Sequence, residues 1–256
     1  MYHRCSLCGG LTRSYWRGFV KCSSCKLIRR AAMPTPANLS KFYRNGWLDP
    51  DGHKQETGGT DLDLARLYVR NLAASLGQRH FAGQSILDFG AGTGATLTAL
   101  SELGARVCAV EPFGYHHLAA QGFAAYRDLS ALPPGSAFDG IVTLDVIEHL
   151  EAPSETVTRL GELLKPHGWI FIATPNPDSL NARVFRSHWR EIKNAGHLMF
   201  FNDTALGTLL RRCGYREGRR LHWKLACGSA LKNIKDYFLQ SAHLDGELRY
   251  LARKGT

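Results

Sequence analysis

One stretch decides the fold of this chain: Ser85-Ile86-Leu87-Asp88-Phe89-Gly90-Ala91-Gly92-Thr93-Gly94-Ala95-Thr96. Its apolar start predicts a buried strand, and the spacing of Leu97, Leu100 and Leu103 predicts a helix after the glycines. Glycine admits a positive φ and a close ligand, and the first N–H groups of a helix attract a carboxylate or phosphate. The stretch therefore predicts a ligand-binding turn between a strand and a helix.

Two nucleoside cofactors fit this turn. The spacing of Gly90, Gly92 and Ala95 satisfies a relaxed dinucleotide fingerprint, which is compatible with NAD. Glu111 follows the next predicted strand, 106–110, and is placed to bind ribose hydroxyls. Both features suit a nucleoside, so the glycines alone leave the cofactor open.

The first motif resembles that of the class I S-adenosylmethionine-dependent methyltransferases, Asp-x-Gly-x-Gly-x-Gly, which is matched from Asp88 to Gly94. This resemblance implies that the turn lies against the methionine part of S-adenosylmethionine. It further implies that Asp88 reaches the amino group of the cofactor through water and that Glu111, followed by Pro112, holds the ribose.

A further acid, Asp128, follows the third predicted strand at 123–126. In the methyltransferase pattern an acid at this place accepts a hydrogen bond from the adenine amino group, and we include its neighbour Leu129 in the expected cofactor site. The alternative for Asp128 is an aspartate of a surface loop.

The fourth predicted strand, Phe138 to Asp145, is followed by Glu148-His149-Leu150, and this combination resembles the small-molecule methyltransferases. Asp145 stands where the carboxyl end of a parallel strand meets a ligand crevice. His149 is either a catalytic base or a residue that shapes the loop beside the cofactor. The Asn/Asp-Pro-Pro-aromatic tetrad of enzymes that methylate exocyclic amines is absent from this strand end. The resemblance extends over residues 86–177.

A histidine near the acceptor is the next expectation. The insertion at 180–202 is similar to the acceptor-facing segment of the ubiquinone-type and polysaccharide-cluster methyltransferases. Zinc-ribbon sugar methyltransferases carry a histidine here that abstracts a proton, and His197 matches it. Their preceding acid is replaced by Gly196 and their aromatic residue by Asn194, which weakens the case for C-methyl chemistry. The alternative for His197 is a histidine that caps the following helix.

Residues 1–30 predict a separate zinc-binding unit. Two Cys-x-x-Cys knuckles, Cys5/Cys8 and Cys22/Cys25, are separated by thirteen residues, as in a tetrahedral Cys₄ zinc site. The segment between them predicts the hairpin of a zinc ribbon. Four thiolates close the coordination sphere, so the expected role of zinc is structural. The alternative is a pair of disulfides.

These signals predict an α/β protein, with a doubly wound Rossmann-like methyltransferase sheet and a small N-terminal zinc ribbon. We expect a ribbon at 1–30, a connector and lid helix at 31–82, the S-adenosylmethionine-binding domain at 83–228 and an amphipathic helical tail at 229–256. Within the connector, Tyr43 and Trp47 either line the cofactor site or pack the connector.

The resemblance implies methyl transfer to a small-molecule acceptor, namely a sugar, nucleotide-sugar or natural-product intermediate. O-methylation is the first choice, with N- and C-methylation open. The formal charge of +10 suits an anionic or glycosidic acceptor. It also keeps open an RNA methyltransferase or nucleic-acid-binding protein, while a homodimer is undecided. No signal-peptide pattern or run of eighteen apolar residues occurs, so we expect a cytoplasmic protein.

Overall fold

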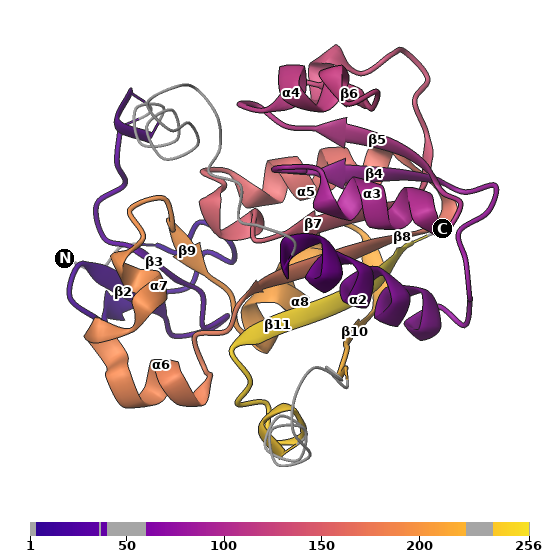
Figure 1. Cartoon of the computed structure of the whole chain (residues 1–256). Helices are drawn as coiled ribbons and strands as arrows, with labels where there is room; N and C mark the ends of the chain where they lie inside the picture. The colour runs from indigo at the N-terminus through magenta and orange to yellow at the C-terminus, as the bar shows by residue number, and fades with distance from the viewer. Residues whose placement is uncertain (1–3, 36, 40–59, 224–237, 256) are drawn as a thin grey trace. The chain divides into compact units, whose positions relative to one another are not determined.

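The computed structural model of the chain describes residues 4–35, 37–39, 60–223 and 238–255 (Figure 1). Its strands form a four-stranded sheet of order β1-β2-β3-β9 and a seven-stranded sheet of order β10-β11-β8-β7-β4-β5-β6. The chain divides into two units. We call residues 36–144 and 162–171 the glycine-loop unit, and residues 1–35, 145–161 and 172–255 the ribbon unit.

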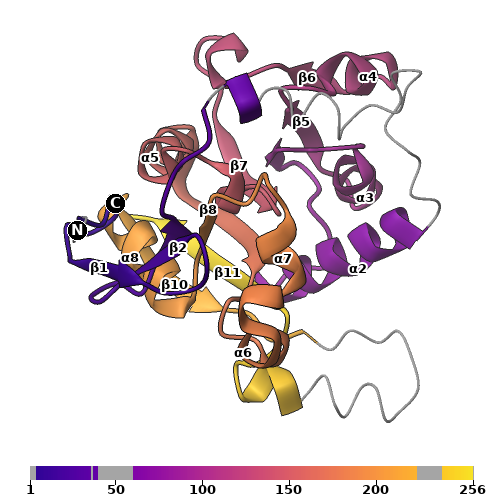
Figure 2. The ribbon, with the colours of Figure 1, turned by 90° about the vertical axis from the view of Figure 1, so that its left-hand side faces the viewer.

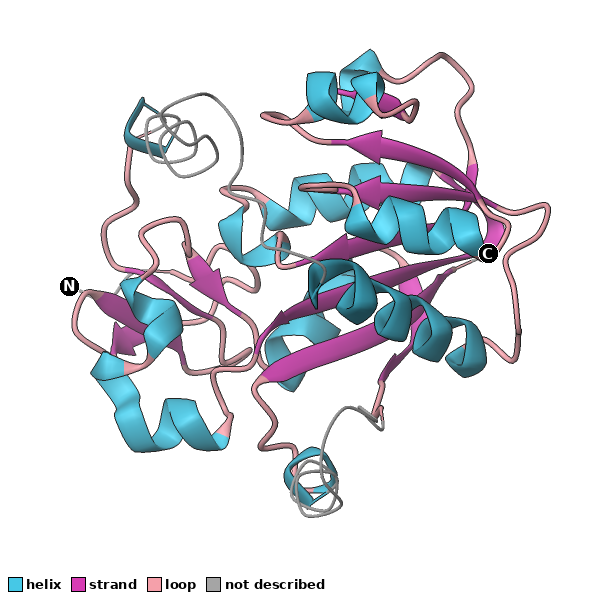
Figure 3. Cartoon of the chain, in the orientation of Figure 1, coloured by secondary structure: helices cyan, strands magenta, loops and turns pink. Residues whose placement is uncertain are grey.

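Parallel strands form the centre of the glycine-loop unit (Figure 3). β4 (Ser85–Phe89) pairs in parallel with β5 (Arg106–Val110) and with β7 (Phe138–Leu144), and β5 pairs in parallel with β6 (Ala124–Tyr126). Leu87 lies opposite Cys108 on one side and Ile141 on the other. These strands are nearly continuous apolar runs, as expected for parallel strands buried on both faces.

This unit contains several helices, and the spacing of Leu97 and Leu100 predicted the one that follows the glycines. They are α2 (Thr60–Ser75), α3 (Ala95–Glu102), α4 (Tyr115–Ala120) and the 3₁₀ turn η1 (Leu129–Ala131). α2 and α3 lie side by side and are joined by an ion pair between Arg66 and Glu102, with the atoms 2.6 Å apart. Leu97 of α3 packs with Leu118 of α4 in a buried cluster below the glycine turn. This cluster fixes the helix that begins at the turn.

The ribbon unit contains the predicted hairpin and one unexpected strand. β1 (Thr12–Ser14), β2 (Phe19–Cys22) and β3 (Ile28–Arg30) form an antiparallel sheet between and after the cysteine knuckles. β9 (Met199–Phe200) extends this sheet by pairing with β3. The ribbon sheet therefore incorporates a strand from the insertion that was predicted to face the acceptor.

The remaining elements lie after residue 145, and they are η2 (Ile147–His149), α5 (Pro153–Glu162), β8 (Leu164–Pro175), α6 (Leu180–Phe185), η3 (Arg186–His188), α7 (Arg190–Lys193), α8 (Asp203–Arg212), β10 (Tyr215–Arg220) and β11 (Glu247–Lys254). Figure 2 shows α6 and α7 close together, as does Figure 1. Asn202 caps α8, since its side chain accepts a hydrogen bond from the Ala205 N–H.

The predicted helical tail at 229–256 is wrong over its last part, because residues 247–254 form β11. β11 pairs antiparallel with β10 and is an interior strand of the seven-stranded sheet. Leu248, Leu251 and Ala252 are buried, so apolar residues lie on both faces of this strand. Their three-residue spacing is also the spacing of an amphipathic helix, which explains the error.

Some expectations fall outside the described residues. These are the roles of Tyr43 and Trp47 and the part of the tail before residue 238. Among the described residues, no helix combines the length and the apolar character needed to cross a membrane.

Candidate active site

The glycine turn has the backbone geometry that its sequence predicts. Gly90, Gly92 and Gly94 have φ angles of 84°, 54° and 88°, a region in which L side chains are strained. The N–H of Gly90 donates a hydrogen bond to the carbonyl of Val110 on β5. A Cβ atom added to Gly94 would lie 2.7 Å from Cδ2 of Leu118. The turn is thus fixed between two strands and leaves its backbone open to close approach.

Glu111, which follows β5, holds this turn by a hydrogen bond. Its Oε2 accepts a hydrogen bond from the Gly92 N–H at 3.0 Å, and its Oε1 accepts one from the Phe113 N–H at 3.1 Å. The backbone N–H of Glu111 donates to the carbonyl of Tyr126 on β6. The carboxylate is buried, and Pro112 and Phe113 beside it are exposed. Phe113 is a site neighbour that the sequence reading missed.

Asp88 is a buried acid with an unsatisfied oxygen. Its Oδ2 has no hydrogen-bond partner among the residues that the structure describes. Burial, and secondarily the charge of Glu111, raises the pKa of Asp88 to about 8. A buried polar atom without a partner costs free energy, and a ligand that donates a hydrogen bond here recovers it. The site fits S-adenosylmethionine, whose amino group is such a donor.

Asp128 lies at the end of β6 in the same unit, where it caps η1. Its Oδ1 accepts hydrogen bonds from the Ser130 and Ala131 N–H groups. The Ser130 hydroxyl and these N–H groups lower the pKa of Asp128, so it is ionised. Asp128 is exposed and Leu129 is half-buried. The predicted residues Asp88, Glu111 and Asp128 all follow or end neighbouring parallel strands.

The ribbon unit holds the other predicted residues, beginning with Asp145. Asp145 has a φ of 52°, an uncommon conformation for a residue with a Cβ. Its N–H donates to the carbonyl of Ala173 at 3.0 Å. Loss of hydration of the carboxyl group, and then the negative charges of Glu247 and Glu191, raise the pKa of Asp145 to about 7. The residue nevertheless keeps part of its surface exposed to solvent.

Glu148 is the deepest acid of this group, with 0% exposure. Its Oε2 accepts a hydrogen bond from the Thr174 hydroxyl at 2.9 Å, and its Oε1 has no partner in the described part of the chain. Burial, and then the charge of Asp145, raises the pKa of Glu148 well above its ordinary value. Burial therefore favours the neutral form of Glu148.

His149 and His197 form a pair, with ring centroids 4.7 Å apart; His197 is buried and His149 is half-buried. Nδ1 of His149 lies 2.9 Å from the carbonyl of Gly196, and Nδ1 of His197 lies 2.9 Å from that of Glu191. A carbonyl oxygen only accepts, so both Nδ1 atoms carry the proton. Nε2 of His197 then accepts from the Asn194 side chain at 3.1 Å.

Both imidazoles are neutral at pH 7. Burial lowers the pKa of His149 and of His197 to about 4. Nε2 of His197 lies 4.0 Å from Oε1 of Glu148. The three residues Glu148, His149 and His197 present one ligand atom each within 4.8 Å of one another, which is also a spacing that a cation can use. The alternative that His197 caps the following helix is wrong, because Asn202 caps that helix, α8.

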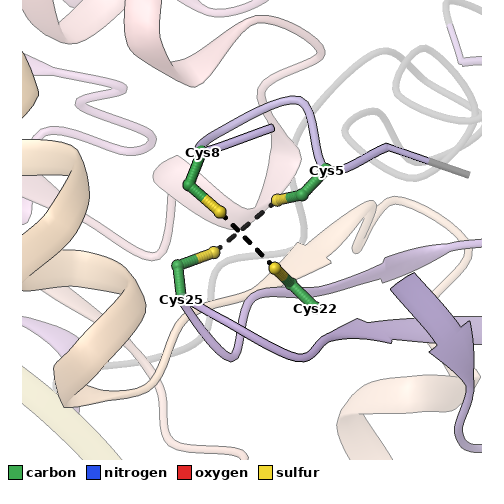
Figure 4. A group of neighbouring side chains, drawn as sticks. All are labelled: Cys5, Cys8, Cys22 and Cys25. Atoms are coloured by element: carbon green, nitrogen blue, oxygen red, sulfur yellow. Dashed lines mark hydrogen bonds between the residues drawn. The ribbon is translucent and has the colours of Figure 1, made fainter. Parts of the chain in front are cut away.

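The four predicted cysteines meet at one point (Figure 4). The sulfur atoms of Cys5 and Cys25 are 3.6 Å apart, and those of Cys8 and Cys22 are 3.5 Å apart. Four thiolates bound to one zinc at 2.3 Å would lie about 3.8 Å from each other, so the cluster fits a tetrahedral metal. The hydrogen bond between Cys5 and Cys25 lowers the pKa of Cys5 and raises that of Cys25, so without metal the two sulfur atoms share a proton.

Comparison with known proteins identifies the class. Residues 61–216 match the profile of a family described as a methyltransferase domain. The chain therefore belongs to this family, which confirms the predicted class of enzyme and sets NAD aside. S-adenosylmethionine is accordingly the cofactor that this family membership supports.

Two proteins to which the chain is similar are named for ubiquinone biosynthesis. A protein of Nitrosococcus oceani named ubiquinone biosynthesis O-methyltransferase is 32% identical over 155 residues, which cover 55% of this chain and 62% of that protein. Its namesake from Cereibacter sphaeroides is 28% identical over 205 residues, covering 70% of this chain and 82% of the relative. The chain thus spans less than two thirds of the first relative.

Solved structures agree on the fold. A methyltransferase from Archaeoglobus fulgidus superposes with a TM-score of 0.56 at 21% identity, over 75% of this chain and 94% of its own. The 1,6-didemethyltoxoflavin N1-methyltransferase of Burkholderia thailandensis has a TM-score of 0.56 at 19% identity, over 96% and 99% of the two chains. At these identities the likeness establishes the Rossmann-like α/β methyltransferase fold and nothing finer.

Proposed function

We propose that this chain transfers a methyl group from S-adenosylmethionine to a small-molecule acceptor, with a hydroxyl oxygen as the first choice of methylated atom. The acceptor classes are a sugar, a nucleotide-sugar or a natural-product intermediate. One observation carries the proposal: a buried acid with an unsatisfied oxygen, Asp88, lies beside a glycine turn that Glu111 fastens. The names of the relatives support O-methylation.

The glycine-loop unit would hold the cofactor. Asp88 reaches the amino group through water, Glu111 binds the ribose hydroxyls and Asp128 the adenine amino group, while Gly90, Gly92 and Gly94 allow close approach. When bound, S-adenosylmethionine supplies a methyl group that is already activated by its sulfonium. Little further activation is needed once the acceptor oxygen is held in line, so positioning accounts for much of the rate.

The ribbon unit would supply the proton acceptor. His197 or His149 takes the acceptor's proton; both are neutral imidazoles, and Nε2 of His197 receives a proton once it gives up its hydrogen bond from Asn194. A pKa of about 4 makes each a weak base. A hydroxyl oxygen becomes strongly acidic as it gains a methyl group, so a weak base suffices for O-methylation. Deprotonating a carbon before methylation needs a stronger base, which argues against C-methylation.

The acceptor-side surface is basic, which supports an anionic acceptor. Arg183, Arg186, Arg190 and Lys193 are all exposed on one stretch of the chain. Exposed guanidinium groups bind phosphate groups in a bidentate manner. We therefore include phosphorylated and nucleotide-linked sugars among the acceptors to be screened. We also propose that the four cysteines hold one structural Zn²⁺.

Calorimetric titration with S-adenosylhomocysteine tests the cofactor site. The wild-type protein should bind it, and Asp88→Ala should bind about tenfold to hundredfold more weakly, because a hydrogen bond to a charged group contributes roughly 1.5–3 kcal/mol. Asp63→Ala, which removes an exposed acid of α2, is the matched control and should bind like wild type. Equal binding by the Asp88 variant would remove the proposal.

The acceptor is tested by screening with labelled S-adenosylmethionine. Nucleotide-sugars, sugar phosphates, phenolic compounds and polyketide or peptide intermediates form the panel, and mass spectrometry locates the added methyl group. We expect a product methylated at oxygen. Methylation at carbon by the purified enzyme would overturn the assignment of the reacting atom, and full turnover by His197→Gln and His149→Gln together would remove both as proton acceptors.

A further inference from the structure

The ribbon is joined to the His197 segment by backbone pairing. β3 and β9 are antiparallel, with Ile28 opposite Phe200 and Arg29 opposite Met199 (Figure 1). The Arg30 N–H donates a hydrogen bond to the carbonyl of Leu198 at 2.9 Å. The residue after His197 is thereby hydrogen-bonded to the last strand of the ribbon.

Arg30 also holds the turn that contains His197. Its Nε donates to the carbonyl of His197 and its Nη2 donates to the carbonyl of Asn194, each at 2.9 Å. The His197 N–H donates to the same Asn194 carbonyl, so the two carbonyls mark the ends of one turn. A planar guanidinium presents two donors to such acceptors in a fixed geometry, which the single ammonium nitrogen of a lysine on its flexible stem does not reproduce. Its carbon Cζ lies 5.1 Å from the ring centre of Phe19.

An apolar cluster also joins the ribbon to the insertion at 180–202. Its buried members are Trp16, Phe19 and Ile28 from the ribbon and Ala182, Trp189 and Phe200 from the insertion. The ring centroids of Phe19 and Phe200 are 5.6 Å apart, and those of Trp16 and Trp189 are 5.9 Å apart. The ring of Phe200 in turn lies edge-on to His197, with centroids 5.8 Å apart. The insertion thus shares its core with the ribbon.

The second cysteine knuckle connects this contact to the metal. Cys22 ends β2, Cys25 follows, and β3 begins at Ile28. The Cys22 N–H donates to the Leu27 carbonyl at 2.9 Å, which sets the path of the chain into β3. The ribbon's own core is small, so bound metal would supply a large part of the free energy that holds its fold.

We propose that the metal-bound ribbon is the template on which residues 194–200 fold, and that Arg30 is the positioning residue that fixes the turn bearing His197. Binding of metal at the cysteines then controls the acceptor side of the enzyme and leaves the glycine-loop unit unaffected. The functional meaning of this control rests on the proposed role of His197. The structural coupling itself does not.

Hydrogen exchange of the full-length protein tests the template. Removal of Zn²⁺ by a chelator should speed exchange of the amides at 194–200 about tenfold or more, since local stability governs exchange. Amides of α8 and of β4 and β5 should keep their rates, and added Zn²⁺ should restore the original pattern. Cys8→Ser should repeat the effect without a chelator. Unchanged exchange at 194–200, or an equal increase throughout the chain, would overturn the proposal.

Arg30 is tested in the zinc-loaded protein. Arg30→Ala should speed exchange at 194–200 and, by removing a nearby positive charge, should raise the pKa of His197 as followed by NMR. Arg30→Lys should restore the pKa but only part of the protection. Arg13→Ala, an exposed arginine of the same sheet, should change neither. An Arg13 variant that matches Arg30→Ala, or full protection in Arg30→Lys, would refute the role of the guanidinium.

The two proposals fail in different ways. S-adenosylhomocysteine affinity should be the same in wild type, Arg30→Ala and the chelated protein. If the wild-type protein does not bind this compound, the proposed function fails while the exchange results still decide the coupling. If Arg30→Ala does not fold, the chelation and Arg30→Lys experiments decide it.

Discussion

Asp88 shows how burial of a single carboxyl makes the stability of the protein depend on pH. With a pKa raised to about 8, the folded protein keeps a proton on Asp88 that the unfolded chain releases near pH 4. Between these two values the folded state binds more protons than the unfolded state. The free energy of unfolding therefore falls as the pH rises, by about 1.4 kcal/mol per pH unit.

Asp88→Asn should remove this dependence, because the amide does not titrate. From pH 5 to pH 7.5 the stability of the variant should gain about 3 kcal/mol relative to wild type without ligand. Urea unfolding at the two pH values measures the difference. A difference that stays constant with pH would show that Asp88 is ionised in the folded protein.

The glycine turn makes a prediction at the level of a whole element. Gly94→Ala forces a Cβ into a left-handed backbone and toward Leu118, so strain and overpacking add to roughly 2–4 kcal/mol of lost stability. Gly135→Ala imposes a similar backbone at φ 77°, but no heavy atom of the described residues lies within 4 Å of its added Cβ. It should cost roughly 1–2 kcal/mol.

Urea unfolding and S-adenosylhomocysteine titration of both glycine variants give the readout. Gly94→Ala should lose ligand affinity as well as stability, whereas Gly135→Ala should bind the ligand normally. If the two variants lost the same stability and bound the ligand equally well, the Leu118 side chain would have moved away from the added Cβ without a loss of free energy.

The elements differ in how well the sequence predicts them. The strands at 85–89 and 106–110 were predictable because parallel strands buried on both faces are short apolar runs, and the acids at their ends follow from the fold. The cysteine knuckles were predictable because metal geometry restricts their spacing. β11 was not, because an interior antiparallel strand and an amphipathic helix share the three-residue spacing of Leu248 and Leu251.

Contacts between residues that are far apart along the chain were even harder to predict from the sequence. β9 is only two residues long, too short for any periodicity. The sequence does not distinguish Arg30 from the other basic residues, because its partners His197 and Asn194 are far away along the chain. His149 and His197 were separate candidates in the sequence; their proximity, burial and low pKa depend on packing that no local pattern reports.

For the molecule as a whole, the excess of 32 basic over 22 acidic residues raises the question of nucleic acid. We expect only weak, sequence-independent binding to a single-stranded RNA, lost as salt rises to physiological levels, because such binding is driven by release of counterions. No methyl group should be transferred to the RNA. Filter binding across a salt series and a labelled-methyl assay provide the measurements. Methylated RNA would establish the alternative enzyme class.

The pairing of β3 with β9 has an evolutionary consequence. Arg30 and His197 stand 167 residues apart, yet one guanidinium joins them. Recombination that exchanged only the N-terminal module between relatives would separate this contact from its acceptor loop and yield an impaired chimera. The two segments should therefore be inherited as a pair, and an engineer who transplants one would have to carry the other with it.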